Sequence, residues 1–185
     1  KRGKGERAKT SRAGCACRDD CTHGMRIMLT RPTLLFYCQH SLGMGHLVRS
    51  LALAQGLATR FRVVFLNGGK LPRGITVPET IEIVSLPPLG MDVEGNLVSR
   101  DRRRTIARTQ TLRAHLIMQT FQTVRPQVVL IELFPFGRKK FAFELVPLLE
   151  AAQQSHPRSH VLCSLRDILV GRQRDQALHD ERASF

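Results

Sequence analysis

The apolar residues of this chain gather in short uninterrupted runs, and longer stretches with helical spacing separate the runs. Uninterrupted Val, Ile and Leu runs are typical of strands buried on both faces, whereas apolar residues three and four positions apart are typical of helices that bury one side. The runs predict strands that begin at Thr33 and end before Gln39, and that lie within 61–69, 81–86, 128–133 and 160–165.

The intervening stretches predict helices after the glycines at 43 and 45, over 101–124, and over about 139–154. Residues 89–100 carry no clear period and are predicted to form a loop. In the helix predicted over 101–124, the apolar positions are Ile106, Leu112, Leu116, Ile117 and Phe121, and Pro126 ends it. We therefore expect strands and helices to alternate throughout.

Buried strands that alternate with helices indicate an α/β fold, in which a parallel sheet is covered on both faces. The sequence predicts a Rossmann-like doubly wound parallel sheet over residues 25–178. The basic tail at 1–24 has no apolar period, and we expect it to be disordered. The polar end at 179–185 resembles the start of a further helix that is cut short.

The net charge of +14 and the pI near 10.9 indicate an anionic partner, which is a nucleic acid, a membrane surface or a phosphorylated small molecule. With one Tyr and no Trp, the chain lacks the aromatic surface on which single-stranded nucleic acids stack, and nucleic acid is disfavoured. No apolar run reaches the roughly 18 residues that a membrane span needs. We expect a cytoplasmic protein and leave open peripheral association with the inner face of the membrane.

In open parallel sheets, ligands bind outside the carboxyl ends of the strands. Polar residues and glycines gather at these predicted ends, namely Gln39, His40, Ser41, Gly43, Gly45, His46, Asn67, Gly68, Gly69, Glu132, Ser164, Arg166 and Asp167. The sequence therefore predicts a ligand site along this edge.

The Gly-x-Gly-His turn precedes a helix N-terminus, where free N–H groups and the helix dipole favour a phosphate. His46 is predicted in the first helical turn, where the dipole favours a neutral imidazole that can accept a proton. Arg49 lies on the same helix face and could reach an anion, and Glu132 could orient a sugar hydroxyl or share the base role.

Each of these residues also has a purely structural alternative. His46 could cap the helix, Arg49 could be solvated, and Glu132 could be satisfied by a neighbouring helix N-terminus. Arg166 and Asp167 could pair with each other. The arginines at 100–108 and the segment at 137–140 are interpreted as solvated charge runs.

The motifs for common cofactors are missing from the sequence. NGGK at 67–70 is too short for a Walker A loop, and Val48 stands where a dinucleotide fingerprint needs a third glycine. The spacing of Cys15, Cys17, Cys21 and His23 does not match the usual zinc motifs. Cys38 and Cys163 are interpreted as buried free thiols. We expect neither a metal ion nor a cofactor.

Four segments carry a resemblance to a known family: HSLGMGHLVRSLALAQGLA, FLNGG, ELFPFGRKKFAFELVPLLEAA and SLRDIL. Over about residues 32–178 the chain resembles the amino-terminal half of predicted bacterial glycosyltransferases of the GT-B fold, related to the peptidoglycan N-acetylglucosaminyltransferase of family 28. In that fold two Rossmann-like domains face each other across a cleft. The first mainly binds the acceptor, and the second holds most of the nucleotide-sugar. The resemblance thus implies a missing donor-binding domain, supplied in cis or in trans.

The resemblance implies transfer of a sugar from a nucleotide-diphosphate sugar to an acceptor hydroxyl. It carries a role over to Gly43, Gly45 and His46, with His46 as general base, and extends to Glu132, Arg166 and Asp167. Two alternatives stay open. The Gly-x-Gly-His-x-x-Arg pattern is shared with UDP-sugar hydrolases of nonulosonic acid synthesis, and the chain could also be a non-catalytic basic Rossmann-like binding module.

Overall fold

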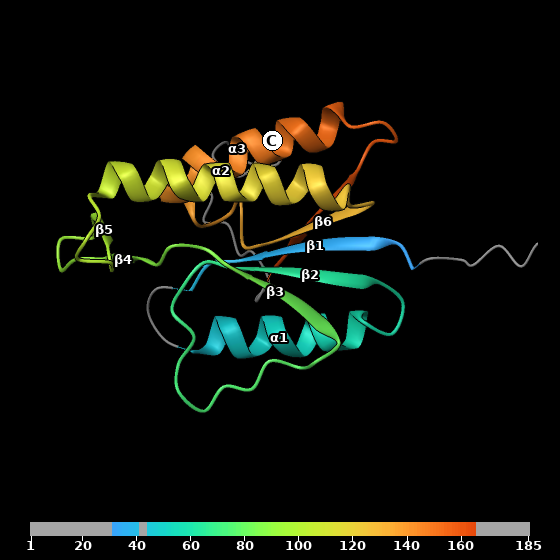
Figure 1. Ribbon diagram of the computed structural model, residues 1–185, viewed down its shortest axis with the longest axis horizontal. Helices are drawn as coiled ribbons and strands as arrows, with labels where there is room; N and C mark the ends of the chain where they lie inside the picture. The colour runs from blue at the N-terminus through green and yellow to red at the C-terminus, as the bar shows by residue number, and fades with distance from the viewer. Residues whose placement is uncertain (1–30, 41–43, 166–185) are drawn as a thin grey trace, which may run out of the picture.

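The computed structural model describes residues 31–40 and 44–165. Five parallel strands form its main sheet in the order β3-β2-β1-β6-β7 (Figure 1). Their bounds are β1 Thr33–Cys38, β2 Arg62–Asn67, β3 Ile81–Ser85, β6 Val128–Glu132 and β7 His160–Ser164. The predictions for the tail at 1–24, its cysteines and His23, for Gly43, Arg166 and Asp167, and for the end at 179–185 concern residues outside this description.

Helices cover both faces of the sheet (Figure 1). Helix α1, Gly45–Leu57, lies on one face. Helix α2, Ile106–Val124, lies on the other beside α3, Ala142–Gln154, which continues the short 3₁₀ turn η1, Lys139–Phe141. Alternate side chains of β1 enter the two cores: Leu34 and Phe36 join the α1 side, and Leu35 and Tyr37 join the other. This arrangement confirms the predicted α/β, Rossmann-like, doubly wound fold.

The expected alternation of strands and helices is wrong between β2 and β3. Residues 68–80 connect these two parallel strands without a helix. Pro72 and Pro78 interrupt the segment, and Gly74 adopts a φ of +86°. A proline supplies no backbone N–H for a helical hydrogen bond, and the apolar side chains between them pack on the α1-side core as an extended layer instead.

The loop predicted at 89–100 is an antiparallel hairpin, formed by β4 Leu89–Met91 and β5 Leu97–Ser99. The following helix begins at Ile106 rather than at 101, because Thr105 caps it: its side chain accepts a hydrogen bond from the Arg108 N–H at 3.2 Å. The arginines at 100 and 102–104 therefore precede the helix, and their side chains are exposed as expected.

The order of the strands locates the crevice where ligands bind in such sheets. From β1 the chain adds β2 and β3 on one side, then returns to add β6 and β7 on the other. The direction of strand addition reverses between β1 and β6, which is the topological switch point of this fold. The first turn of α1 and the β4–β5 hairpin both lie toward the carboxyl ends of the strands (Figure 1).

Within the described residues, no helix combines the length and the apolar character needed to cross a membrane.

Candidate functional site

His46 and Glu132 meet at this switch point. His46 lies in the first turn of α1, which follows β1, and Glu132 is the last residue of β6. The Nδ1 atom of His46 contacts Oε1 of Glu132; the His46 side chain is 22% exposed and that of Glu132 only 1%. An ionised carboxylate can only accept, so a neutral imidazole in this contact would carry its proton on Nδ1. The lone pair then lies on Nε2, which is the atom that can accept a proton from a ligand.

Both oxygens of Glu132 are engaged by the protein. Oε2 accepts a hydrogen bond from Nη2 of Arg138 at 3.3 Å, while Oε1 faces His46. The sequence predicted that Glu132 orients a sugar hydroxyl or shares the base role; this geometry favours a third role, in which the carboxylate orients the imidazole of His46. Among the described residues the partners of Glu132 are two side chains, which does not support the alternative that a helix N-terminus satisfies its carboxylate.

Met44 is the N-cap residue of α1, and within the described residues no side chain forms a capping hydrogen bond there. The imidazole of His46 is turned toward Glu132, which does not support the alternative that His46 serves as a helix cap. The amides of a first helical turn and the positive end of the helix dipole favour an anion.

The side chain of Arg49 is half-buried and is held by two hydrogen bonds. Its Nη1 donates to Oγ of Ser164 at 3.0 Å, and its Nη2 donates to the carbonyl of Leu165 at 2.6 Å. These bonds join α1 to the end of β7. Arg49 therefore fixes the position of the helix on the crevice rather than serving as an unoccupied anion ligand.

The structural need for glycine at 45 is smaller than expected. Gly45 is the first residue of α1, its φ is not positive, and an added Cβ would meet no described atom within 4 Å. The chain itself thus accepts a side chain at this position. Only the close approach of a ligand would require a glycine there.

We therefore expect Gly45→Ala to leave the free energy of unfolding unchanged or to raise it by up to about 1 kcal/mol, because alanine loses less backbone entropy on folding. Gly56→Ala is the matched control, since Gly56 is exposed in the same helix and its Cβ would also meet open space. Urea denaturation of both variants checks this. A loss above 1 kcal/mol in Gly45→Ala alone would show a backbone requirement.

The glycine pair after β2 serves packing rather than phosphate binding. A Cβ on Gly68 would lie 2.1 Å from Oε1 of Gln39, and a Cβ on Gly69 would lie 2.4 Å from the carbonyl oxygen of His40. The end of β1 thus packs directly on the backbone after β2. Nε2 of His40 bonds Oδ1 of Asn67 at 2.9 Å, and the Asn67 amide donates to the Gly69 carbonyl at 2.8 Å.

Burial lowers the pKa of His40 below its ordinary value, although the bond to Asn67 acts in the opposite direction. The folded state therefore prefers the neutral imidazole, and the unfolded chain binds more protons at mildly acidic pH. This contribution to stability is present above the unfolded pKa of about 6.5 and is lost as the pH falls below it.

From this we expect the wild-type chain to lose more stability between pH 7.5 and pH 5.5 than His40→Gln, whose amide can keep the bond to Asn67 but does not titrate. The urea midpoint at the two pH values is the measurement. His115→Gln, which replaces an exposed histidine, should keep the wild-type slope. Equal slopes in the wild type and His40→Gln would show that His40 does not titrate in this range.

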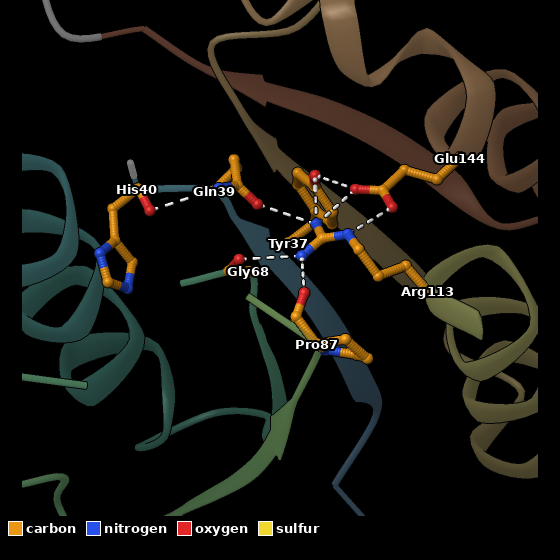
Figure 2. A network of polar contacts seen from close by, with 7 residues as sticks. All are labelled: Tyr37, Gln39, His40, Gly68, Pro87, Arg113 and Glu144. Atoms are coloured by element: carbon orange, nitrogen blue, oxygen red, sulfur yellow. Dashed lines mark hydrogen bonds and ion pairs between the residues drawn. The ribbon is translucent and has the colours of Figure 1, made fainter. Parts of the chain in front are cut away.

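A second buried network lies at the carboxyl ends of β1, β2 and β3 and is centred on Arg113 (Figure 2). Arg113 of α2 is fully buried, and its Nε and Nη2 donate to the two oxygens of Glu144 at 2.8 and 2.6 Å. Nη1 donates to the carbonyls of Gly68 and Pro87 at 2.8 and 2.9 Å, and Nη2 also donates to Oε1 of Gln39 at 2.8 Å. One guanidinium thereby joins the ends of β1, β2 and β3 to α3.

Tyr37 completes this network by donating its hydroxyl to Oε1 of Glu144 at 2.5 Å. Burial and the Glu144 carboxylate raise the pKa of Tyr37 well above its ordinary value, so the hydroxyl stays protonated. Burial alone would lower the pKa of Arg113, but the contacts with Glu144 outweigh it and the pKa is raised. The network is therefore a fixed ion pair with all five guanidinium N–H groups engaged.

Sequence reasoning missed Arg138, Arg113 and Glu144. The segment at 137–140 was interpreted as a solvated charge run, which holds for Lys139 and Lys140 but is wrong for Arg138, whose side chain is only 14% exposed. The position of Arg138 shortly after the end of β6 was the feature of the sequence that could have indicated a site residue. Arg113 had a periodic signal, because Thr109, Arg113, Ile117 and Phe121, the buried residues of α2, follow one another at intervals of four.

The described cysteines differ in burial. Cys38 is buried as predicted, and burial raises the pKa of its thiol to about 12, so it stays protonated. Cys163 is half-buried rather than fully buried. Across residues 31–40 and 44–165, no group of three or more His, Cys, Asp or Glu side chains is arranged to hold a metal ion.

No family model and no curated protein sequence matches this chain. Similar solved structures include Phytolacca americana UGT2 complexed with UDP-2fluoro-glucose and pterostilbene, at 20% identity and a TM-score of 0.40. Apo UGT2 of the same species has 20% identity and a TM-score of 0.41, and a UDP-glucosyltransferase from Polygonum tinctorium has 20% and 0.33. The matches cover 64%, 62% and 64% of this chain but only 29%, 28% and 29% of those chains.

Proposed function

We propose that this chain is the acceptor-side domain of a glycosyltransferase of the GT-B fold, which moves a sugar from a nucleotide-diphosphate sugar to an acceptor hydroxyl. The observation that carries the proposal is the pairing of His46 with Glu132 at the switch between β1 and β6. Ligands of doubly wound sheets bind at this place, and an oriented imidazole there is suited to general-base catalysis.

In the proposed reaction, Nε2 of His46 accepts the proton of the acceptor hydroxyl. The acceptor oxygen attacks the anomeric carbon of the donor, and the bond from that carbon to the diphosphate breaks. The nucleoside diphosphate leaves with the electron pair. Glu132 holds Nδ1–H of His46 in place and balances the positive charge that the imidazole gains, as carboxylates do in other histidine-based sites.

The start of α1 would contribute to the same reaction. Negative charge develops on the leaving diphosphate, and the amides of the first helical turn together with the helix dipole would stabilise an anion that approaches Gly45. The donor-binding half would supply most contacts to the nucleotide, in cis or in trans. We accordingly expect little turnover from the 185-residue chain by itself.

The test is product analysis with a panel of nucleotide-diphosphate sugars, using this chain in its full-length reading frame or mixed with the donor-binding half. The assay is run with and without an acceptor that carries a hydroxyl. Glycosylated acceptor, with free sugar formed slowly in its absence, is the expected result. Free sugar released at the full rate without acceptor would instead identify a hydrolase, and no turnover of any donor would leave only a binding module.

A further inference from the structure

The carboxylate of Glu132 contacts two side chains at once. Its Oε1 faces Nδ1 of His46, and its Oε2 accepts a hydrogen bond from Nη2 of Arg138 at 3.3 Å. The side chain of Glu132 is 1% exposed and that of Arg138 is 14% exposed, so water and salt screen this ion pair only weakly. The negative charge that faces the imidazole is therefore shared with a guanidinium.

The turn after β6 adopts an uncommon backbone conformation that brings Arg138 back to the last residue of the strand. Leu133 and Arg138 have φ values of 68° and 60°, in the left-handed region that residues other than glycine rarely adopt. Between them, the N–H of Gly137 donates to the carbonyl of Leu133 at 2.5 Å and closes the turn. Such strained residues persist where the surrounding structure holds them, and they gather at functional sites.

Arg138 also leaves one of its own donors without an acceptor. Its Nε is buried and makes no hydrogen bond to another described residue. A buried guanidinium N–H without an acceptor is unfavourable, and native proteins rarely leave one. An unpaired donor and two left-handed residues thus accompany the placement of this guanidinium on Glu132. The pairing of Arg138 with Glu132 therefore needs an explanation other than the stability of the turn.

The titratable and charged groups around His46 come from the end of β1, from α1, and from β6 with the turn that follows it. They are Cys38, His40, Arg49, Glu132 and Arg138. Burial lowers the pKa of His40 and raises that of the Cys38 thiol, so both groups are uncharged at neutral pH. Arg49 is held at the end of β7. Among the described contacts, the charges joined to the imidazole are thus those of Glu132 and Arg138.

These two charges act on the imidazole in opposite directions. A carboxylate beside an imidazole favours the protonated imidazolium, and a nearby cation opposes it. An imidazolium has no lone pair on Nε2 and cannot act as a general base. The carboxylate that orients His46 would therefore also hold a second proton on it, unless another group shares the carboxylate's charge.

From these contacts we propose that Arg138 is a positioning residue of the candidate site. It shares the charge of Glu132, so that the carboxylate orients the imidazole of His46 and yet leaves it unprotonated at neutral pH. The inference rests on the proposed function, because it concerns the base of that reaction.

The pH dependence of kcat/KM in the full-length protein tests this role, because it reports the titration of groups in the free enzyme. The substrates are the donor and the acceptor that the product analysis identifies. In Arg138→Met, the pH at which kcat/KM falls to half on the acidic side should be about one unit higher than in the wild type, since one close charge has an effect of this size. The loss of activity should be about tenfold below the wild-type midpoint and should vanish on the alkaline plateau. An equal loss at every pH would show a merely structural role and overturn the proposal.

Further variants separate the charge of Arg138 from its shape. Arg138→Lys keeps the charge and should keep the wild-type pH profile, whereas Arg138→Gln should show the raised midpoint even if Arg138→Met does not fold. Lys139→Met is the matched control, because it removes an exposed cation from the next residue; it should leave the profile unchanged. Arg138→Met combined with His40→Gln should still show the raised midpoint, which would exclude His40 as the titrating group. A midpoint raised equally by Lys139→Met would overturn the assignment to Arg138.

An experiment without turnover separates this inference from the proposed function. In the 185-residue chain, the imidazole C–H resonances of His46, assigned with His46→Ala, are followed by NMR as the pH is changed. Their midpoint should also be about one unit higher in Arg138→Met than in the wild type. This difference, in a protein that transfers no sugar, would support the role of Arg138 and refute the transferase. Equal midpoints in the two proteins would overturn the role of Arg138, whether or not the full-length protein transfers sugar.

Discussion

Arg113→Met is expected to lower the free energy of unfolding by about 3–5 kcal/mol, the cost of breaking a buried ion pair from one side. Methionine fills much of the space but leaves the Glu144 carboxylate buried without its cation. It also leaves the carbonyls of Gly68 and Pro87 without their donor. Each abandoned acceptor adds to the loss, because water does not reach this fully buried position.

Guanidinium chloride denaturation of the variant against the wild type measures this loss. Arg108→Met is the matched control, because Arg108 is exposed on the same helix; it should change stability by less than about 0.5 kcal/mol. Arg113→Met combined with Glu144→Leu should recover part of the loss, since the unpaired charge is then removed as well. A single variant that loses under 1 kcal/mol, or a double variant no more stable than the single, would contradict the account.

His46→Ala is expected to lower kcat by about 10²-fold or more in the full-length protein, because general-base catalysis contributes on this scale. The fold should change little, since His46 lies at the surface of the first helical turn and does not cap it. Steady-state kinetics with a nucleotide-diphosphate sugar and its acceptor measures the effect, and urea denaturation of the same variant measures stability.

Glu132→Gln extends this test to the orientation of the base. The amide keeps the shape of the carboxylate but can also turn its NH₂ toward His46, so the imidazole loses the partner that holds its proton on Nδ1. We expect kcat to fall while the KM for the donor stays similar. His115→Ala, at an exposed position on α2, should behave as the wild type. Full activity in His46→Ala together with a weakened fold would assign His46 a structural role.

Much of the fold could be predicted because the central strands β1, β2 and β6 are uninterrupted apolar runs, the pattern typical of strands buried on both faces. The connection between β2 and β3 could not, because the helix was assumed from alternation, although Pro72 and Pro78 opposed it. The hairpin at 89–99 was missed for a related reason. Its strands are three residues each, too short for a period to show.

For the candidate site, the sequence indicated His46 and Glu132 separately, as residues at strand ends. Their pairing depends on β1 and β6 being neighbours, which local patterns do not specify. The four-residue spacing of Arg113 indicated that it lies on the buried face of its helix, but the groups that would pair its charge could not be predicted, because its acceptors come from four distant segments, at 39, 68, 87 and 144.

The contact between Glu132 and Arg138 bears on which domain of the proposed enzyme supplies the base and which supplies the sugar donor. The proposed proton acceptor lies in the first turn of α1, the carboxylate that orients it ends β6, and the guanidinium that shares that carboxylate lies in the turn after β6. In the proposed reaction, the base is thus assembled before any sugar donor binds. The donor-binding half would then supply only the sugar donor. The preference for a donor could therefore change without any change in His46, Glu132 or Arg138.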